Sequence, residues 1–516
     1  MRRLAADLAA SLGADARVAT TVGVERATLR LLGVGGLDHA GRPLAASVVD
    51  RAIANDPVRL ARGVLLPFVA AVMLYEAPPL DIATDVASGA IDLDLEAEAL
   101  ADPVRRAEVE TVAEALMVTA FARIEANRTA RFDVLDVLGD APEPLVGVPL
   151  RATHIDRSRD EAAVLVAGGA DILRVEVPAS RELADLLVGT SDAVLADAGI
   201  RIAREPRAAD GPAPTGSQRA LAAIRSIVDE AAAERRAYAR VAVVPRALGG
   251  PELSVVASLE RIDDVHADPL SEIVVAGVEP ARALADHSFL RRLLRRAGCR
   301  VVVDAGALAV GPDLATGLPA PAVGRAGRAL ALQALSVELA RADGLEDGDL
   351  LLGSLPPWLL AERSAGAIAL AYVAAQRRLY PGIGFMLSEP EGPSPSRDRW
   401  CQLGTLALIV AGGAAVVSRD ANEDSVAAVV DETRSSAETA ARLAVDAGPI
   451  AFGPGLDAAG AAIAASAIET LEGLDRSGWG AILGSVAPPG SHLAAGTSAP
   501  RADAPDVFAM GIRATA

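Results

Sequence analysis

The sequence predicts an α/β protein built on a (β/α)8 barrel of the TIM type. Eight short apolar runs, typical of buried parallel strands, lie between Pro144 and Asp420. Helical patterns separate nearly all of them, and the units follow one another within roughly 280 residues, the usual span of such a barrel. A doubly wound sheet is the alternative architecture, but no G-x-G-x-x-G turn follows the first strand.

The predicted strands share short length and enrichment in Val, Ile and Leu. They are Leu145–Leu150, Ile172–Val177, Val241–Val244, Ile273–Val275, Arg300–Val303, Asp349–Leu352, Gly382–Leu387 and Ala414–Val417. The intervening helices are predicted at Asp160–Ala167, Gln218–Arg236, Glu279–Ala297, Arg325–Arg341 and Ser364–Leu379. A Pro/Gly-rich loop, Ala203–Ser217, lies inside this region and is either an active-site element or a disordered insert.

The segment from Asp268 to Gly306 shows one complete β-α-β unit. Its apolar β-branched run Ile273–Val275 predicts a strand, and a helix with leucines at helical spacing follows. Gly298 ends the helix, and Val301–Val303 predict the next strand, which leads to Asp304. Two parallel strands need such a crossover, so this unit supports the barrel.

The ends of the chain predict helical regions around the barrel. We expect a helical N-terminal region over residues 1–142, the barrel over 143–424, and a C-terminal helical region and tail over 425–516. In the N-terminal region, Thr20 or Thr21 caps a helix that ends near Gly33. Further helices are predicted at Ala45–Ala54, Val58–Tyr75, Leu80–Ser88 and from Pro103 to about Asn127, and after the barrel at Ser425–Ala447 and Ala458–Glu472.

Composition excludes several classes of protein. The net charge of −19 argues against nucleic-acid binding and against an anionic membrane surface. The two cysteines form neither a disulfide framework nor a zinc site, and no apolar run is long enough to span a membrane, so we expect a cytoplasmic protein. The chain contains no lysine, so it cannot form a Schiff base with pyridoxal phosphate.

Polar residues at the predicted strand ends are the candidate site residues, because barrel active sites lie at the carboxyl ends of the strands. They are His154, Glu176, Arg246, Glu279, Asp304, Ser354, Glu389 and Arg419. From these and Ser418 we select Asp304, Arg246 and His154 as catalytic candidates and Glu176, Ser354 and Ser418 as cofactor-binding candidates. We expect no metal site, since no histidines are spaced as metal ligands. Asp264-Val-His266 is similar to the start of a cobalamin-binding D-x-H-x-x-G motif, but Pro269 stands where the glycine is needed, so we interpret it as a loop before a strand.

Short motifs in conserved order resemble the large (α) subunit of lysine 5,6-aminomutase over nearly the whole chain. They include Thr21-Val-Gly-Val-Glu25-Arg26-Ala27, Arg30 to Gly33, Leu37-Asp38, Ser88 to Leu93, Gly169-Ala170-Asp171, Pro251-Glu252, Leu259 to Asp263, Asp286, Phe289, Ser418 and Glu469 to Gly484. The resemblance implies a helical N-terminal layer, a barrel and a C-terminal accessory region. It also implies a radical 1,2-amino shift that depends on adenosylcobalamin and pyridoxal phosphate. A smaller β-type subunit would carry the cobalamin and supply the lysine for pyridoxal phosphate.

The sequence departs from this family where its ligand-binding residues are expected. An arginine after the second barrel strand corresponds to Val177, and a serine after the third corresponds to Arg246. A tyrosine and an arginine around the fourth correspond to Ser271 and Ala276, and an aspartate past the fifth falls near Ala307 or Leu308. The resemblance therefore implies a retained scaffold with a replaced ligand set.

Three hypotheses follow. The first is an α-type barrel subunit of an adenosylcobalamin-dependent aminomutase, acting on lysine or on a different amino acid. The second is a non-catalytic paralogue that serves as a partner or corrinoid-docking subunit. The third is a repurposed barrel in which His154, Glu176 and Asp304 act as acid, base or metal ligands.

Overall fold

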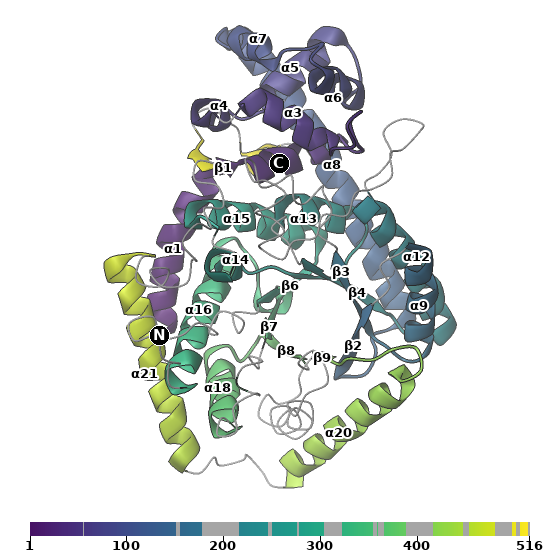
Figure 1. Cartoon of the computed structure of the whole chain (residues 1–516), viewed down its shortest axis with the longest axis vertical. Helices are drawn as coiled ribbons and strands as arrows, with labels where there is room; N and C mark the ends of the chain where they lie inside the picture. Colours follow the sequence, from purple (N-terminus) through teal and green to yellow (C-terminus); the bar gives the residue numbers. More distant parts are fainter. Residues whose placement is uncertain are drawn as a thin grey trace.

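A computed structural model describes residues 1–54, 56–150, 155–177, 216–245, 250–275, 278–303, 322–353, 359, 366–388, 416–446, 454–479, 498–501 and 506–513. Eight parallel strands close into a barrel in chain order (Figure 1). The strands are β2 (Leu145–Leu150), β3 (Ile172–Val177), β4 (Arg240–Pro245), β5 (Asp264–His266), β6 (Arg300–Val303), β7 (Leu350–Gly353), β8 (Gly384–Ser388) and β9 (Val416–Ser418). The predicted (β/α)8 barrel is confirmed, and the doubly wound sheet is wrong.

One predicted strand is wrong. Ile273–Val275 lies on helix α14 (Pro269–Val275), and the strand at this place in the barrel is β5. Three apolar β-branched residues do not distinguish a buried strand from a buried helix. The preceding Asp268-Pro269 is a helix-start signal: the Asp268 carboxylate accepts the Leu270 N–H at 2.9 Å, and Pro269 is the first helical residue.

Helices surround the barrel and follow the strands, as Figure 1 shows in a view down the strands. They are α9 (Ile155–Ala167), α12 (Gly216–Arg235), α13 (Gly250–Leu259), α14, α15 (Pro280–Ala297), α16 (Ala322–Ala342), α18 (Gly366–Leu379) and α20 (Val426–Asp446). Alternate strand residues such as Val265, Val301 and Val303 join the core between strands and helices. The residues between them point into the barrel.

The N-terminal region is helical, as predicted. It contains α1 (Arg2–Val18), α2 (Val22–Leu31), α3 (Leu44–Ile53), α4 (Pro57–Arg62), α5 (Leu65–Tyr75), α6 (Pro79–Ser88), α7 (Leu93–Ala99) and α8 (Pro103–Leu138). The Thr21 hydroxyl caps α2 by accepting the Val24 N–H at 3.0 Å, which confirms the predicted cap. Gly63 interrupts the single helix predicted over Val58–Tyr75, which is instead α4 and α5.

The N-terminal helices have an apolar core of their own, which includes Leu29, Val49, Phe68 and Ile82. In the described part of the chain no single helix is long and apolar enough to cross a membrane. The helices α5 and α6 are bent by 107° relative to each other. Taken together, they have the length and composition of a membrane span, and no other property supports one.

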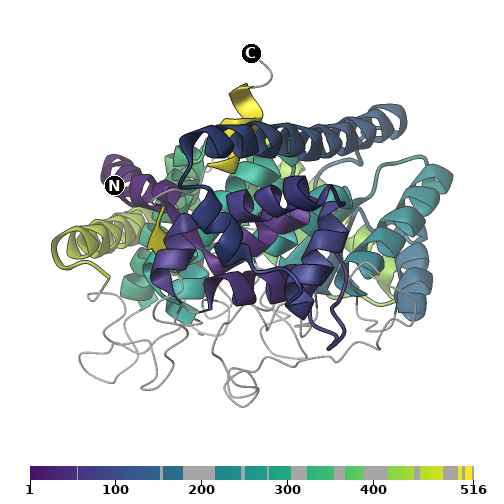
Figure 2. The same ribbon diagram turned by 90° about the horizontal axis from the view of Figure 1, so that it is seen from above.

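The long helix α8 lies against the barrel at the end where its strands begin. Asn127 donates to the Leu259 carbonyl at 3.0 Å, and Arg131 donates to the Ile262 carbonyl at 2.7 Å, just before β5. Figure 2 shows α8 in blue across one side of the molecule, with the yellow helix α23 (Val507–Arg513) upon it. Phe508 of α23 contacts Phe121 of α8 with ring centroids 5.6 Å apart. The strand β10 (Ser498–Pro500) pairs antiparallel with β1 (Ala19–Thr21), so a segment from the N-terminal part of the chain meets one from the C-terminal part here.

The helix α21 (Pro454–Ser477) packs along α16, α18 and α1. Gly327 of α16 permits this close approach, because a Cβ atom at this position would lie 2.4 Å from the Ser466 Cβ and 2.9 Å from the Ile463 carbonyl oxygen. A Gly327→Val substitution should therefore lower the free energy of unfolding by about 1–3 kcal/mol, as overpacking usually does. Denaturant unfolding measures the loss.

Gly324→Ala is the matched control for this prediction. Gly324 lies one turn earlier on the same helix, and a Cβ atom there would meet nothing within 4 Å. Alanine is the better helix former, so this variant should be as stable as the wild type or slightly more stable. Equal destabilisation by both substitutions would show that the contact with α21 does not matter.

Candidate functional site

Ion pairs close the barrel interior near the amino-terminal ends of the strands. The Arg300 guanidinium donates to both carboxylate oxygens of Asp264, at 2.6 and 2.9 Å. Arg240 donates to both oxygens of Asp140 at 2.7 and 2.6 Å. An apolar layer lies beside these pairs and is formed by Ala141, Leu145, Ile172, Ala242, Val302, Leu351, Met386 and Val416. The interior is thus filled at this level, as expected of a packed barrel.

Polar side chains follow this apolar layer along β3 and β5. Arg174 comes two residues after Ile172, and His266 comes two residues after Asp264, so both share the inward strand face. A Cβ atom built on Gly147 of β2 would lie 3.9 Å from the Arg174 Cδ. The aliphatic part of the arginine side chain therefore passes over Gly147, which has no side chain. We refer to Arg174 and His266 as the interior polar pair.

The interior polar pair combines a cation with a neutral imidazole. Burial, together with the Arg174 charge, lowers the pKa of His266 to about 3. Its buried Nε2 atom has no hydrogen-bond partner among the described residues. A buried polar atom is normally hydrogen-bonded, and an exception indicates a ligand, a water molecule or strain. A cation and an unused imidazole nitrogen above an apolar layer suit the anionic group of a ligand.

Lowering the pH should test whether the His266 imidazole is neutral in the folded protein. In the fold its pKa is depressed to about 3, whereas an unfolded histidine has a pKa of about 6.5, so only the unfolded state takes up this proton as the pH falls below about 6.5. The stability of the wild type should therefore fall more steeply than that of His266→Gln, by roughly 1–2 kcal/mol between pH 6.5 and 5.

Urea unfolding at a series of pH values measures this difference between the two proteins. His39→Gln at an exposed position is the control and should follow the wild-type curve. Parallel wild-type and His266→Gln curves would contradict a neutral imidazole at this position.

The structure places the sequence-predicted site residues only in part. Glu176 is paired in register with Val244 near the end of β3, and Ser418 ends β9 in register with Gly147 and Ser388. His154, Arg246, Asp304 and Ser354 lie outside the described residues, as does Glu389. Their roles, and those of Glu176 and Ser418, stay predictions.

Two further strand-end candidates have structural contacts. Glu279 precedes α15 rather than following a strand, and its carboxylate accepts the Ser498 hydroxyl of β10 at 3.2 Å. Arg419 follows β9, is buried, and donates to the Thr433 hydroxyl of α20 at 3.2 Å and to Glu432 at 3.2 Å. Some of the contacts of Glu279 and Arg419 therefore join the barrel to β10 and α20.

Neither member of the interior polar pair was among the site residues predicted from the sequence. Arg174 was detectable, because it stands between apolar residues in a predicted strand and shares a face with Ile172. His266 was not, because β5 is three residues long and two of them are polar. Asp264-Val-His266 is this strand itself, not the loop before one. Ser271 lies on α14, the helix that follows β5 in the chain. Ala276 lies outside the described residues.

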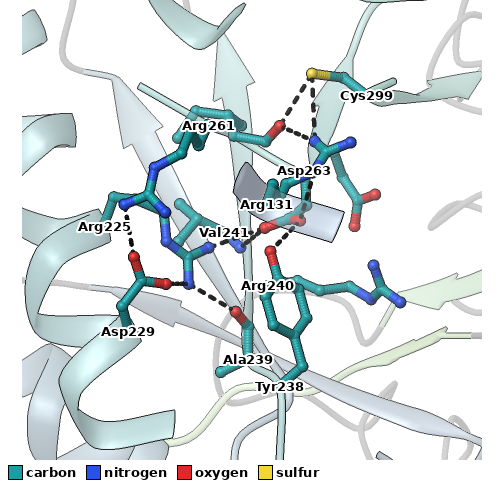
Figure 3. Close-up of polar contacts among 12 residues, drawn as sticks. Arg131, Arg225, Asp229, Tyr238, Ala239, Arg240, Val241, Arg261, Asp263 and Cys299 are labelled. Carbon is teal, nitrogen blue, oxygen red and sulfur yellow. Dashed lines mark hydrogen bonds and ion pairs between the residues drawn. The ribbon is translucent and has the colours of Figure 1, made fainter. Parts of the chain in front are cut away.

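A second polar cluster lies at the amino-terminal ends of β4, β5 and β6 (Figure 3). The buried Asp263 carboxylate accepts the Val241 N–H at 2.8 Å, the Tyr238 hydroxyl at 2.8 Å and the Arg225 guanidinium at 3.0 Å. Arg131 of α8 lies 3.7 Å from the same carboxylate. Burial raises the pKa of Tyr238, so the hydroxyl remains a donor.

Cys299 belongs to the same second polar cluster. Its thiol donates to the Ile262 carbonyl at 2.9 Å, and burial raises its pKa to about 11. Polar groups at the amino-terminal end of the strands of such a barrel serve stability, because active sites lie at the opposite end. We therefore assign the cluster around Asp263 to the fold rather than to the site.

The motifs in the N-terminal part of the chain form contacts between α2 and the barrel helices. The Thr21 hydroxyl donates to the Asp286 carboxylate of α15, and Arg30 pairs with Glu252 of α13 at 3.2 Å. A Cβ atom on Gly23 would lie 3.2 Å from the Asp286 Oδ1, so a side chain there would crowd this contact. These residues fix the N-terminal helices to the barrel.

In the described part of the chain no three His, Cys, Asp or Glu side chains are grouped to hold a metal ion. The fold and the interior polar pair define a (β/α)8-barrel protein that keeps polar groups inside the barrel, beyond an apolar layer. The chain belongs to the family of the D-lysine 5,6-aminomutase TIM-barrel domain of the alpha subunit, whose model matches residues 1–381.

Two curated relatives carry the same description, lysine 5,6-aminomutase alpha subunit. The protein of Acetoanaerobium sticklandii is 27% identical over 290 residues, which are 56% of this chain and 51% of that protein. The protein of Fusobacterium nucleatum is 26% identical over 389 residues, 73% of this chain and 68% of that protein. The chain thus spans about half the length of the first relative. Among solved structures, Yersinia pestis dihydropteroate synthase is 12% identical to this chain, and the match covers 59% of this chain and 94% of that protein. Its TM-score is 0.34, which is too low to support an argument.

Proposed function

We propose that this chain is the barrel subunit of an aminomutase that uses adenosylcobalamin and pyridoxal phosphate for a radical 1,2-amino shift on an amino acid. The observation that carries the proposal is the family match over residues 1–381, supported by two relatives described as lysine 5,6-aminomutase alpha subunits. The departures at Val177, at Arg246 and near Ala307 or Leu308 favour ligand contacts and substrates that differ from those of the relatives.

The chain needs a partner to hold these cofactors. It contains no lysine, so a lysine Schiff base with pyridoxal phosphate would need another subunit. His266 lies on a barrel strand with its Nε2 buried, a place that does not suit a ligand to a corrin. We therefore expect a cobalamin-binding β-type subunit that also contributes the lysine.

The interior polar pair fits the phosphorylated cofactor. Arg174 supplies a positive charge for an anionic group, and the unpartnered His266 Nε2 supplies one hydrogen bond. The apolar layer beside them excludes water from one side of this region. When bound, the two cofactors supply the radical and the electron sink, and the barrel residues bind and orient the reactants.

Spectroscopic titration tests the proposal. The purified chain is titrated with pyridoxal phosphate and with adenosylcobalamin, alone and together with the proposed β-type subunit. We expect no change in the visible spectrum of either cofactor with this chain alone, and a change at stoichiometric protein once the β-type subunit is added. A complex that forms but binds neither cofactor would support the non-catalytic paralogue instead.

A further inference from the structure

Two buried glutamines lie at the carboxyl ends of β6 and β7. Gln333 is midway along α16, and Gln376 is on α18. The Gln333 Nε2 donates to the Val303 carbonyl at 3.3 Å and to the Gly353 carbonyl at 2.8 Å. The Gln376 Nε2 donates to the same Gly353 carbonyl at 3.1 Å and to the Gln333 Oε1. The last residues of two neighbouring strands are thus joined by side-chain amides.

Packing does not require amides here. Most residues around Gln333 on α16 are buried alanines and leucines, and both glutamines are at most 1% exposed. Burial of an amide in such surroundings is costly unless its hydrogen bonds are made. Gln333 uses its full capacity, because its Oε1 also accepts the Tyr372 hydroxyl at 3.4 Å. Gln333 therefore serves the carbonyls to which it donates, whereas the buried Gln376 Oε1 has no hydrogen-bond partner among the described residues.

These carbonyls are the last of their strands. The β6–β7 register ends at the pair Val303 and Leu352, so the Val303 and Gly353 carbonyls lie at the end of the ladder. The residues that follow in the sequence are Asp304 and Ser354, both predicted site residues.

We propose that Gln333 and Gln376 are positioning residues, which fix the carboxyl ends of β6 and β7, beside the strand β5 that carries His266. The proposal rests on the proposed function for the identity of the ligand. Neither glutamine needs to contact that ligand; each acts through a strand-end carbonyl. A loss of the amide should therefore loosen the strand ends and weaken the site more than it destabilises the fold.

The test compares Gln333→Met with Tyr238→Phe in the full-length chain, with the partner subunit present. Methionine keeps the length and volume of glutamine but leaves both carbonyls without this donor. Tyr238→Phe removes one buried hydrogen bond at the opposite end of the barrel and is the matched control. Hydrogen–deuterium exchange is measured over residues 300–308 and 349–357, and the affinity for pyridoxal phosphate is measured by titration.

We expect Gln333→Met to speed exchange in both segments and to weaken pyridoxal phosphate binding, each at least tenfold, while Tyr238→Phe changes neither. Unchanged exchange, or faster exchange with unchanged affinity, would overturn the positioning role. If Gln333→Met does not fold, Gln376→Met replaces it and should affect residues 349–357 more than residues 300–308, because Gln376 reaches the Val303 carbonyl only through Gln333. If the wild-type complex binds no pyridoxal phosphate, the proposed function fails, and exchange alone then decides whether the glutamines hold the strand ends.

Discussion

Replacement of Asp263 by alanine should lower the free energy of unfolding by about 3–5 kcal/mol. Asp263 is buried, and its carboxylate is a partner of Arg225, Tyr238 and the Val241 N–H. Its removal leaves the guanidinium of Arg225 and a backbone N–H buried without this acceptor, and such a loss is among the most destabilising single changes known.

Equilibrium denaturation of Asp263→Ala measures this loss, and Asp229→Ala is its control. Asp229 pairs with the same Arg225 and with Arg261, but its side chain is 23% exposed, so water can replace it. The control should lose about 1 kcal/mol or less. Equal losses in the two variants would show that the cluster around Asp263 contributes no more than a surface ion pair.

The second large effect concerns the interior polar pair. Replacement of Arg174 by methionine should weaken the binding of pyridoxal phosphate to the two-subunit complex by roughly 10- to 100-fold, because a hydrogen bond to a charged group contributes about 1.5–3 kcal/mol. Methionine retains an apolar stem over Gly147 while removing the charge. Titration of the complex with the cofactor measures the change.

Two comparisons make the Arg174 result specific. Arg174→Met should leave the affinity between the subunits unchanged, because Arg174 faces the barrel interior. Arg442→Met, at a side chain that is 80% exposed, should change neither quantity. An unaltered cofactor affinity in Arg174→Met would remove this arginine from the site.

Most of the barrel was predictable from the sequence because its strands are buried on both sides. Val301–Val303 and Ile172–Val177 are apolar runs bounded by helical patterns, and they became β6 and β3. β5 was not predictable in the same way, because Asp264 and His266 occupy its inward positions and leave Val265 as its only apolar residue. The apolar run that misled the prediction belongs to α14, which is buried beside α15 and α16.

The candidate site was less predictable than the fold. Position at the end of a strand singled out Glu176 and Asp304, but it gave no reason to examine residues deeper in the barrel such as Arg174. The two glutamines could not be identified from sequence patterns, because a polar residue in a helix is ordinarily assigned to a solvated face. Only the strand ends on which they converge reveal their role.

The most direct test of the proposed function is amino-acid turnover by the two-subunit complex. The chain is combined with its β-type partner, both cofactors and a panel of amino acids that includes lysine, and products are identified by mass spectrometry and NMR. The proposal predicts an isomer whose amino group has moved to the adjacent carbon, formed only when both subunits and both cofactors are present. A complex that binds both cofactors yet forms no such isomer from any amino acid in the panel would contradict it.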